Sequence, residues 1–229
     1  MSVIWTKIGI YKRVAYGSEA DLEGAIAQVQ STLFGPNRIY LDVKKKIGMK
    51  GRIQNIPDGY LLDLNGHKPR LYVVENELAS HDLHRHIVPQ LVQFSVSFEE
   101  EPRTVKKILF NALQEKPEAR TQSEIYAQVR GLRNLDYMLE CLVFESKFTV
   151  LLIIDEVPQN LQSVLANKLG FEVEILQLTR YESETGERIY QFKPFLSDID
   201  AHFGGGNEVA QKRKEKSIRR LRNNEANCA

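Results

Sequence analysis

Apolar and polar residues follow two different periods along the chain, and these periods predict helices and strands in a definite order. Between residues 18 and 34, apolar residues recur every three or four positions, which is typical of a helix that buries one face. Ser18 is a suitable N-cap, with Asp21 three residues on, and Gly35-Pro36 ends the pattern. The apolar positions are Leu22, Ile26, Val29 and Leu33.

The next segments have the pattern of strands. Residues 38–43 predict one strand, and residues 56–64 and 70–78 predict two more, separated by Asn65-Gly66, a strong hairpin signal. Apolar residues stand at consecutive positions in both arms of this hairpin. We therefore expect a sheet that is covered on both faces.

The second half of the chain predicts a helical stretch and then a strand–helix–strand end. Helices are expected at 82–98, with Pro89 at a kink or in the first turn, and at about 102–115 and 122–145, separated by residues 115–118. The apolar run at 148–154 predicts a buried, parallel strand. The remaining elements are a helix at 159–169, ended by Gly170, and strands at 171–181 and 188–193. This order predicts an α/β fold with a mixed central β-sheet flanked by helices and a helical insertion at about 102–145.

Composition is ordinary for a soluble globular protein, with 42% hydrophobic and 27% charged residues among 229. No apolar run approaches the roughly 18 residues that span a bilayer, and the first residues do not have the pattern of a signal peptide. Cys141 and Cys228 support neither a disulfide framework nor a zinc site. We expect a cytoplasmic protein with one domain at 1–196 and a flexible, glycine-containing linker with a basic tail at 197–229.

The net charge of +1 conceals two basic clusters. One follows the first predicted strand, and the other lies in the tail. The tail cluster is interpreted either as a solvated charge run or as a non-specific contact to phosphates. The clusters comprise Lys44, Lys45, Lys46, Lys50 and Arg52, and Lys212, Arg213, Lys214, Lys216, Arg219, Arg220 and Arg222.

Three carboxylates coincide with the predicted hairpin. Asp58 starts its first strand, while Glu75 and Glu77 lie on the second and point to the same face because side chains alternate along a strand. Carboxylates buried together in an apolar strand repel one another unless a cation lies between them. Oxygen ligands of this kind suit Mg²⁺ or Mn²⁺.

Ile56-Pro57-Asp58 followed by Glu75-Asn76-Glu77 at the end of an apolar strand resembles the PD-(D/E)xK motif of restriction-endonuclease-like nucleases. The resemblance extends to an acid in the first helix, Glu23 with Glu19 as the reserve, and to Gln90 on the helix after the motif. It covers most of residues 18–181. The resemblance implies a Mg²⁺- or Mn²⁺-dependent deoxyribonuclease, in which Asp58, Glu75 and Glu77 hold the metal and Gln90 and Glu23 complete the catalytic set.

This chain departs from the family at Glu77, where the family carries lysine. Glu77 is interpreted as a base or a ligand of a second metal, or else a lysine from elsewhere replaces the missing one. The candidates for that lysine are Lys44, Lys45, Lys46 and Lys50.

The resemblance also implies partners. DNA is the expected substrate, contacted by the two basic clusters, RNA is an alternative, and dimers among such nucleases suggest a homodimer. The rival hypothesis is a catalytically inactive relative that acts as a DNA-binding or protein-interaction module. Plainer interpretations also exist, because Pro57-Asp58-Gly59 is a common turn sequence and the two glutamates could pair with Arg70 or Arg85.

His81, His84 and His86 follow Glu77 closely. Their spacing does not place all three on one helical face, and no other Cys or His cluster completes a zinc set. We therefore interpret them as surface histidines at a helix start, with His86 as the candidate ligand if one of them is functional.

Overall fold

The computed structural model describes residues 2–48 and 55–193. These residues form eight strands and six α-helices, and Met1–Lys193 make one compact unit. The strands are β1 (Val3–Trp5), β2 (Ile10–Val14), β3 (Arg38–Leu41), β4 (Gly59–Asp63), β5 (Arg70–Glu77), β6 (Thr149–Ile154), β7 (Glu172–Ser183) and β8 (Arg188–Phe192). The helices are α1 (Glu19–Phe34), α2 (Val88–Glu100), α3 (Pro102–Glu115), α4 (Pro117–Val129), α5 (Leu135–Glu140) and α6 (Leu161–Lys168), with π-helical turns η1 (Leu83–Ile87) and η2 (Cys141–Glu145).

The strands make one mixed sheet, in the order β1-β2-β7-β6-β5-β4-β3, with β8 also paired to β7. The central pairs β5–β6 and β6–β7 are parallel, and β3–β4–β5 are antiparallel. The α/β class with a mixed sheet and flanking helices is thus confirmed. So are the hairpin of β4 and β5 and the parallel, buried β6, both predicted from apolar runs.

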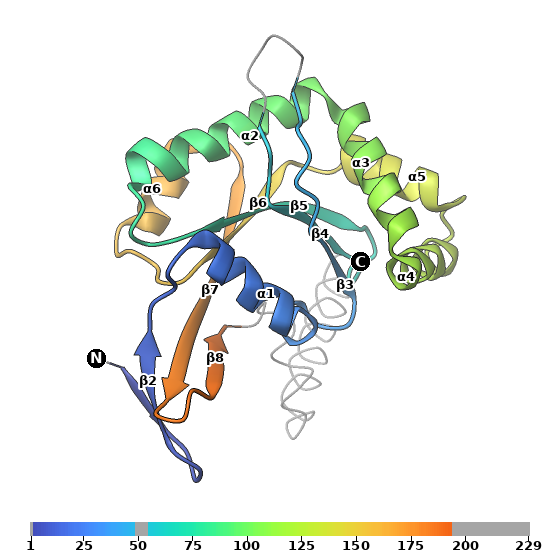
Figure 1. The fold of residues 1–229 in the computed structure, drawn as a ribbon. Helices are drawn as coiled ribbons and strands as arrows, with labels where there is room; N and C mark the ends of the chain where they lie inside the picture. Colours follow the sequence, from blue (N-terminus) through green and yellow to red (C-terminus); the bar gives the residue numbers. More distant parts are fainter. Residues whose placement is uncertain (1, 49–54, 194–229) are drawn as a thin grey trace, which may run out of the picture. The chain divides into compact units, whose positions relative to one another are not determined.

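Helices cover the two faces of the central strands (Figure 1). One face carries α1, whose buried residues include Leu22, Ile26 and Phe34. The other face carries α2 and the helices that follow, and residues of α2 to α6 share one apolar core with alternate residues of the strands, such as Val73 of β5 and Leu152 of β6. Alternation along each strand therefore supplies both cores from the same short sequences.

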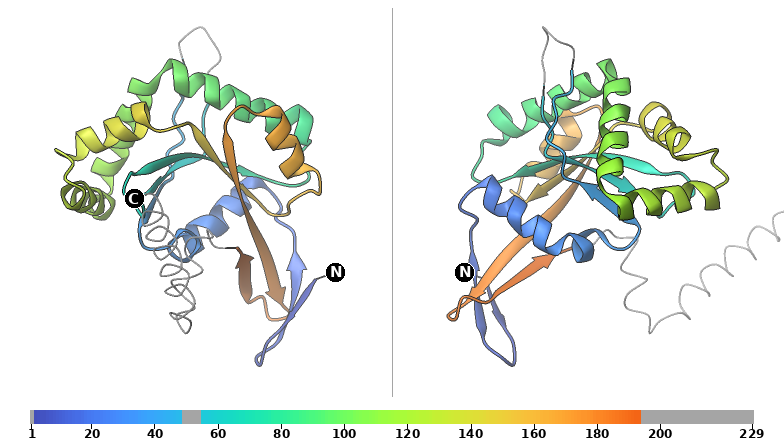
Figure 2. Two further views of the ribbon diagram at one scale, coloured as in Figure 1. Left: turned by 180° about the vertical axis from the view of Figure 1, so that it is seen from behind. Right: turned by 45° about the vertical axis from the view of Figure 1, so that its right-hand side comes forward.

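The second half of β7 leaves the central strands and forms an antiparallel ribbon with β2 and β8 (Figure 2). Val14 pairs with Arg180, and Leu178 pairs with Phe192. The sequence does not reveal β1 and β2, because they are short and their burial is irregular. Their position depends on pairing with a segment about 170 residues later in the chain.

Two predictions about the helices are decided by single residues. Ser18 caps α1, accepting a hydrogen bond from the Asp21 main chain, and Pro89 lies in the first turn of α2 directly after η1. The predicted helix at 122–145 is wrong. The predicted break at residues 115–118 is present between α3 and α4, but Pro117 already starts α4, as proline suits a first helical turn. Gly131, at φ 69°, lies between α4 and α5.

Within residues 2–48 and 55–193, no helix has both the length and the apolar composition that crossing a bilayer needs.

Candidate metal centre

Asp58 lies where β4 separates from β5. The pairing of the two strands ends with Gly59 opposite Val74, whereas β5 continues to Glu77 beside β6. The main-chain N–H of Asn76 donates to Asp58 Oδ2 at 2.8 Å, so the carboxylate replaces the strand partner that Asn76 would otherwise have. Gly59 is required at this point because a Cβ there would come within 2.7 Å of the Leu41 carbonyl oxygen.

Glu75 is buried in the sheet, with 4% of its surface exposed. Gln90 Nε2 of α2 donates to Oε1, while Oε2 is buried and has no hydrogen-bond partner among the described residues. Burial, and then the negative charges of Asp58 and Glu77, raise the pKa of Glu75 to about 10. Burial also raises the pKa of Asp58 to about 6, although the Asn76 N–H and Lys44 oppose this.

Glu77 is 1% exposed, and each of its oxygens faces a histidine. His81 Nδ1 lies 2.7 Å from Oε2, and His86 Nε2 lies 3.3 Å from Oε1. Burial raises the pKa of Glu77, and the histidines oppose that effect. The third carboxylate of the motif therefore has its own partners.

Lys44 brings a positive charge to the carboxylates. Its Nζ lies 2.6 Å from Glu23 Oε1 and 3.5 Å from Asp58 Oδ1. Glu23 belongs to α1, so the first-helix acid, the lysine and Asp58 form a chain of contacts. Lys45 and Lys46 are exposed, while Lys50 and Arg52 lie outside the described residues.

The predicted site residues therefore lie at one end of the sheet in adjoining groups. Asp58 contacts Lys44, which holds Glu23, and Glu75 contacts Gln90. Among the described residues, one group of three or more acidic, histidine or cysteine side chains offers ligand atoms that all lie within 4.8 Å of one another. It comprises Glu19, Glu77, His81 and His86.

The sequence predicts some of these residues and misses others. It offers His86 as the candidate ligand among the three histidines, and Lys44 among the lysines near the motif. It offers Glu19 only as the reserve for Glu23, and it gives His81 no ligand role. The one local signal for His81 is its spacing of four residues from Glu77. That spacing predicts a contact only within a helix, and Glu77 ends a strand. The basic residues of the tail, Lys212, Arg213, Arg219 and Arg220, lie outside the described residues.

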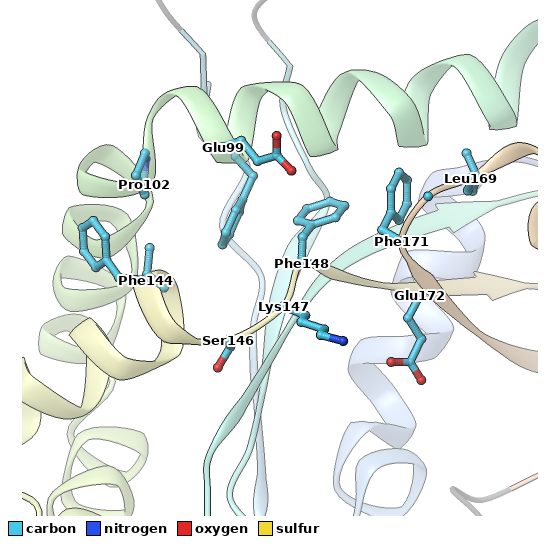
Figure 3. Close-up of a pocket in the computed structure, with 12 residues that line it drawn as sticks. Glu99, Pro102, Phe144, Ser146, Lys147, Phe148, Leu169, Phe171 and Glu172 are labelled. Carbon is cyan, nitrogen blue, oxygen red and sulfur yellow. The ribbon is translucent and has the colours of Figure 1, made fainter.

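A pocket of about 860 Å³ lies at the other end of the sheet, where β6 and β7 begin (Figure 3). Its wall includes the aromatic series Phe98, Phe148 and Phe171, with ring centroids 5.2 Å and 5.0 Å apart. Strands β5, β6 and β7 run parallel there, so their carboxyl ends lie at the opposite end of the sheet from this pocket. Glu75 and Glu77 stand at the carboxyl end of β5, and the pocket is therefore separate from both of them.

The chain shows no significant match to a protein-family model, to a curated protein or to a solved structure. Its function is therefore inferred from the contacts, burial and charge of the side chains at the end of β5.

Proposed function

We propose that this chain is a metal-dependent nuclease with a restriction-endonuclease-like domain, which hydrolyses phosphodiester bonds in DNA. The observation that carries the proposal is Glu75, a buried glutamate with one oxygen lacking a hydrogen-bond partner among the described residues, beside Asp58. An unpaired buried carboxylate is costly, and a divalent cation is the partner that offsets the cost for two carboxylates together.

The donor set fits Mg²⁺ or Mn²⁺. Asp58 and Glu75 offer carboxylate oxygens, which these hard cations prefer, and Glu77 follows on the same strand face. When bound, the cation would polarise a phosphoryl oxygen and lower the pKa of a bound water. The shift of both pKa values toward the neutral form means that cation binding competes with protons, so the proposed site fills better at higher pH.

The chain's own residues then have separate tasks. Gln90 fixes the Glu75 carboxylate by donating to Oε1, which leaves Oε2 for the cation. Lys44 supplies the ammonium group that Glu77 cannot, and Glu23 holds it beside Asp58. Of the lysines named from the sequence, Lys44 has these contacts, which supports a lysine moved to another strand end.

DNA as the substrate rests on the family resemblance and on positive charge near the site. Lys45 and Lys46 are exposed and follow Lys44 directly, so they can contact backbone phosphates without reading sequence. RNA has the same phosphates and belongs in the same test.

The test is cleavage of labelled single-stranded, duplex and branched DNA, and of RNA, with Mg²⁺ or Mn²⁺. Asp58→Asn and Glu75→Gln should each lower the cleavage rate by at least about 100-fold, because each removes a charged ligand. Asp136→Asn is the matched control, since Asp136 is exposed and pairs with Lys106 on the helical insertion. Cleavage that survives both site substitutions would exclude the proposed site.

A second candidate function, a catalytically inactive nucleic acid-binding module, is favoured by one observation. Glu77 replaces the family lysine, and both of its oxygens already face histidines. Wild-type protein that binds DNA but cleaves no substrate with either cation would support this alternative.

A further inference from the structure

Four side chains from separate segments converge beside the proposed nuclease carboxylates. Glu19 comes from the first turn of α1, Glu77 from the end of β5, His86 from η1, and His81 from the segment between β5 and η1. One ligand atom of each lies within 4.8 Å of the ligand atoms of the other three.

His81 makes the densest contacts of the four. Its Nδ1 faces Glu77 Oε2 at 2.7 Å and Glu19 Oε1 at 3.2 Å. One ring nitrogen carries at most one hydrogen, so it cannot donate fully to both carboxylates. A cation among these atoms would satisfy all of them at once.

Burial gives the group a fixed base and an open side. Glu77 is 1% exposed, whereas the side chains of His81 and His86 are 34% and 51% exposed. The two rings lie 5.1 Å apart at 85°, edge to face, and are therefore not stacked. The main chain at Ala79, before His81, is tied to Asp155 Oδ1 by a 2.7 Å hydrogen bond. An ion can reach the group from solvent, and the segment that carries His81 is anchored to the end of β6.

We propose that Glu19, Glu77, His81 and His86 form a transition-metal site of the Zn²⁺ class. Two imidazoles with two carboxylates suit Zn²⁺ or Co²⁺, whereas Mg²⁺ prefers an all-oxygen set and retains water. The site shares Glu77 with the strand face of the proposed nuclease centre but uses neither Asp58 nor Glu75, so it goes beyond the nuclease activity and does not depend on it.

The competing explanation is that the two histidines are protonated counterions of buried Glu77. Both explanations keep the contacts, but they differ in what happens on adding metal. If the histidines are only counterions, adding Zn²⁺ produces no saturable binding. If they are ligands, the group binds Zn²⁺ and releases protons.

The experiment is calorimetric titration of the full-length, tag-free chain with Zn²⁺, repeated with Mg²⁺, and absorption spectroscopy with Co²⁺ as a probe of nitrogen-containing coordination. We expect one Zn²⁺ per chain in wild type at this site. His81→Gln and His86→Gln should each weaken binding by about 100-fold or more, since even groups outside the ligand shell change affinity by 10–100-fold.

The chain offers a matched control in His84. It lies in the same turn and is exposed, its main-chain N–H donates to Asp82, and its ring is not part of the group. His84→Gln should therefore bind Zn²⁺ as wild type does. Circular dichroism and thermal unfolding of each variant would confirm that the fold is intact.

Asp58→Asn and Glu75→Gln separate this site from the proposed nuclease centre. Both should keep Zn²⁺ binding within about threefold of wild type, whether or not the protein cleaves DNA. Absence of saturable Zn²⁺ binding below about 1 mM, equal binding by the His81, His86 and His84 variants, or loss of binding in Asp58→Asn would each overturn the site.

Discussion

Strands β5 and β6 lie side by side in parallel and are similarly buried, yet β5 ends in acidic side chains and β6 in aliphatic ones. Leu152 and Ile154 of β6 stand in register with Glu75 and Glu77 of β5. All four residues are at most 4% exposed. The same environment therefore receives aliphatic side chains from one strand and carboxylates from the next.

This contrast separates the residues that stabilise the fold from those that give it a chemical capacity. Burying a leucine or isoleucine side chain contributes about 1.5–3 kcal/mol, whereas burying a carboxylate costs free energy unless it is neutralised or paired. β6 thus supports the sheet, and β5 carries groups that are unfavourable in the protein alone. Such a trade of stability for function is expected where a strand supplies metal ligands, as we propose for β5.

Leu152→Ala should have the largest effect because it removes the apolar side of this contrast. Leu152 is completely buried in the core beneath the helices, so a cavity would lower the free energy of unfolding by about 2–5 kcal/mol. Urea denaturation measures the change, and Leu152→Met, which conserves volume, should cost less than about 1.5 kcal/mol. A loss as small for alanine as for methionine would mean that β6 does not support the core as described.

Glu75→Gln, at the partner position, should act in the opposite direction. At neutral pH the folded protein holds Glu75 protonated, since its pKa is raised to about 10, while the unfolded chain ionises it. The amide removes the need to take up a proton, so the metal-free protein should gain about 1–2 kcal/mol. Denaturation in EDTA at pH 7 and pH 4 tests this, with the gain vanishing at pH 4, where the glutamate is neutral in both states. The same stability difference between Glu75→Gln and wild type at both pH values would show that Glu75 is ionised in the folded protein and that its charge is compensated there.

The stability of the metal-free wild type should depend on pH through the carboxyl groups of Asp58 and Glu75. Folding raises the pKa of Asp58 to about 6 and that of Glu75 to about 10, so the folded state binds more protons than the unfolded state above pH 4. Stability from these groups is thus fully present below pH 4 and falls as pH rises, by at most about 1.4 kcal/mol per pH unit for each proton. Asp58 contributes to this decline up to about pH 6, and Glu75 contributes to it up to about pH 10. Thermal unfolding in EDTA across pH 4–9 should show the decline, and Mg²⁺ or Mn²⁺ should flatten it.

Lys44→Met should have the smallest effect on stability, below about 1 kcal/mol, because its ion pairs with Glu23 and Asp58 are partly exposed. The pKa of Asp58 should rise further, since Lys44 holds it down. An NMR titration of the Asp58 carboxyl carbon measures this shift. Lys45→Met, on the exposed neighbour, is the control and should leave the Asp58 titration unchanged; a similar shift in both variants would argue against a specific contact.

Local patterns were sufficient for much of the fold. The Ser18 cap, the β4–β5 hairpin and buried β6 follow from features within a few residues of one another, which is why they were predictable. The same reach explains the failures. The short strands β1 and β2 depend on a distant partner, and a single glycine with a left-handed conformation, Gly131, divides the predicted helix at 122–145.

By itself the sequence determined that Asp58, Glu75 and Glu77 lie on one hairpin and that Gln90 follows on a helix, because strand alternation and a short turn leave few other arrangements. Only the tertiary structure decided their partners. Glu23 of α1 meets Lys44, and Glu19 of α1 meets His81, because α1 packs on the sheet with its first turns near these residues, which lie up to about 60 positions away in the chain. Such contacts arise from the packing of whole elements, and no local periodicity encodes them.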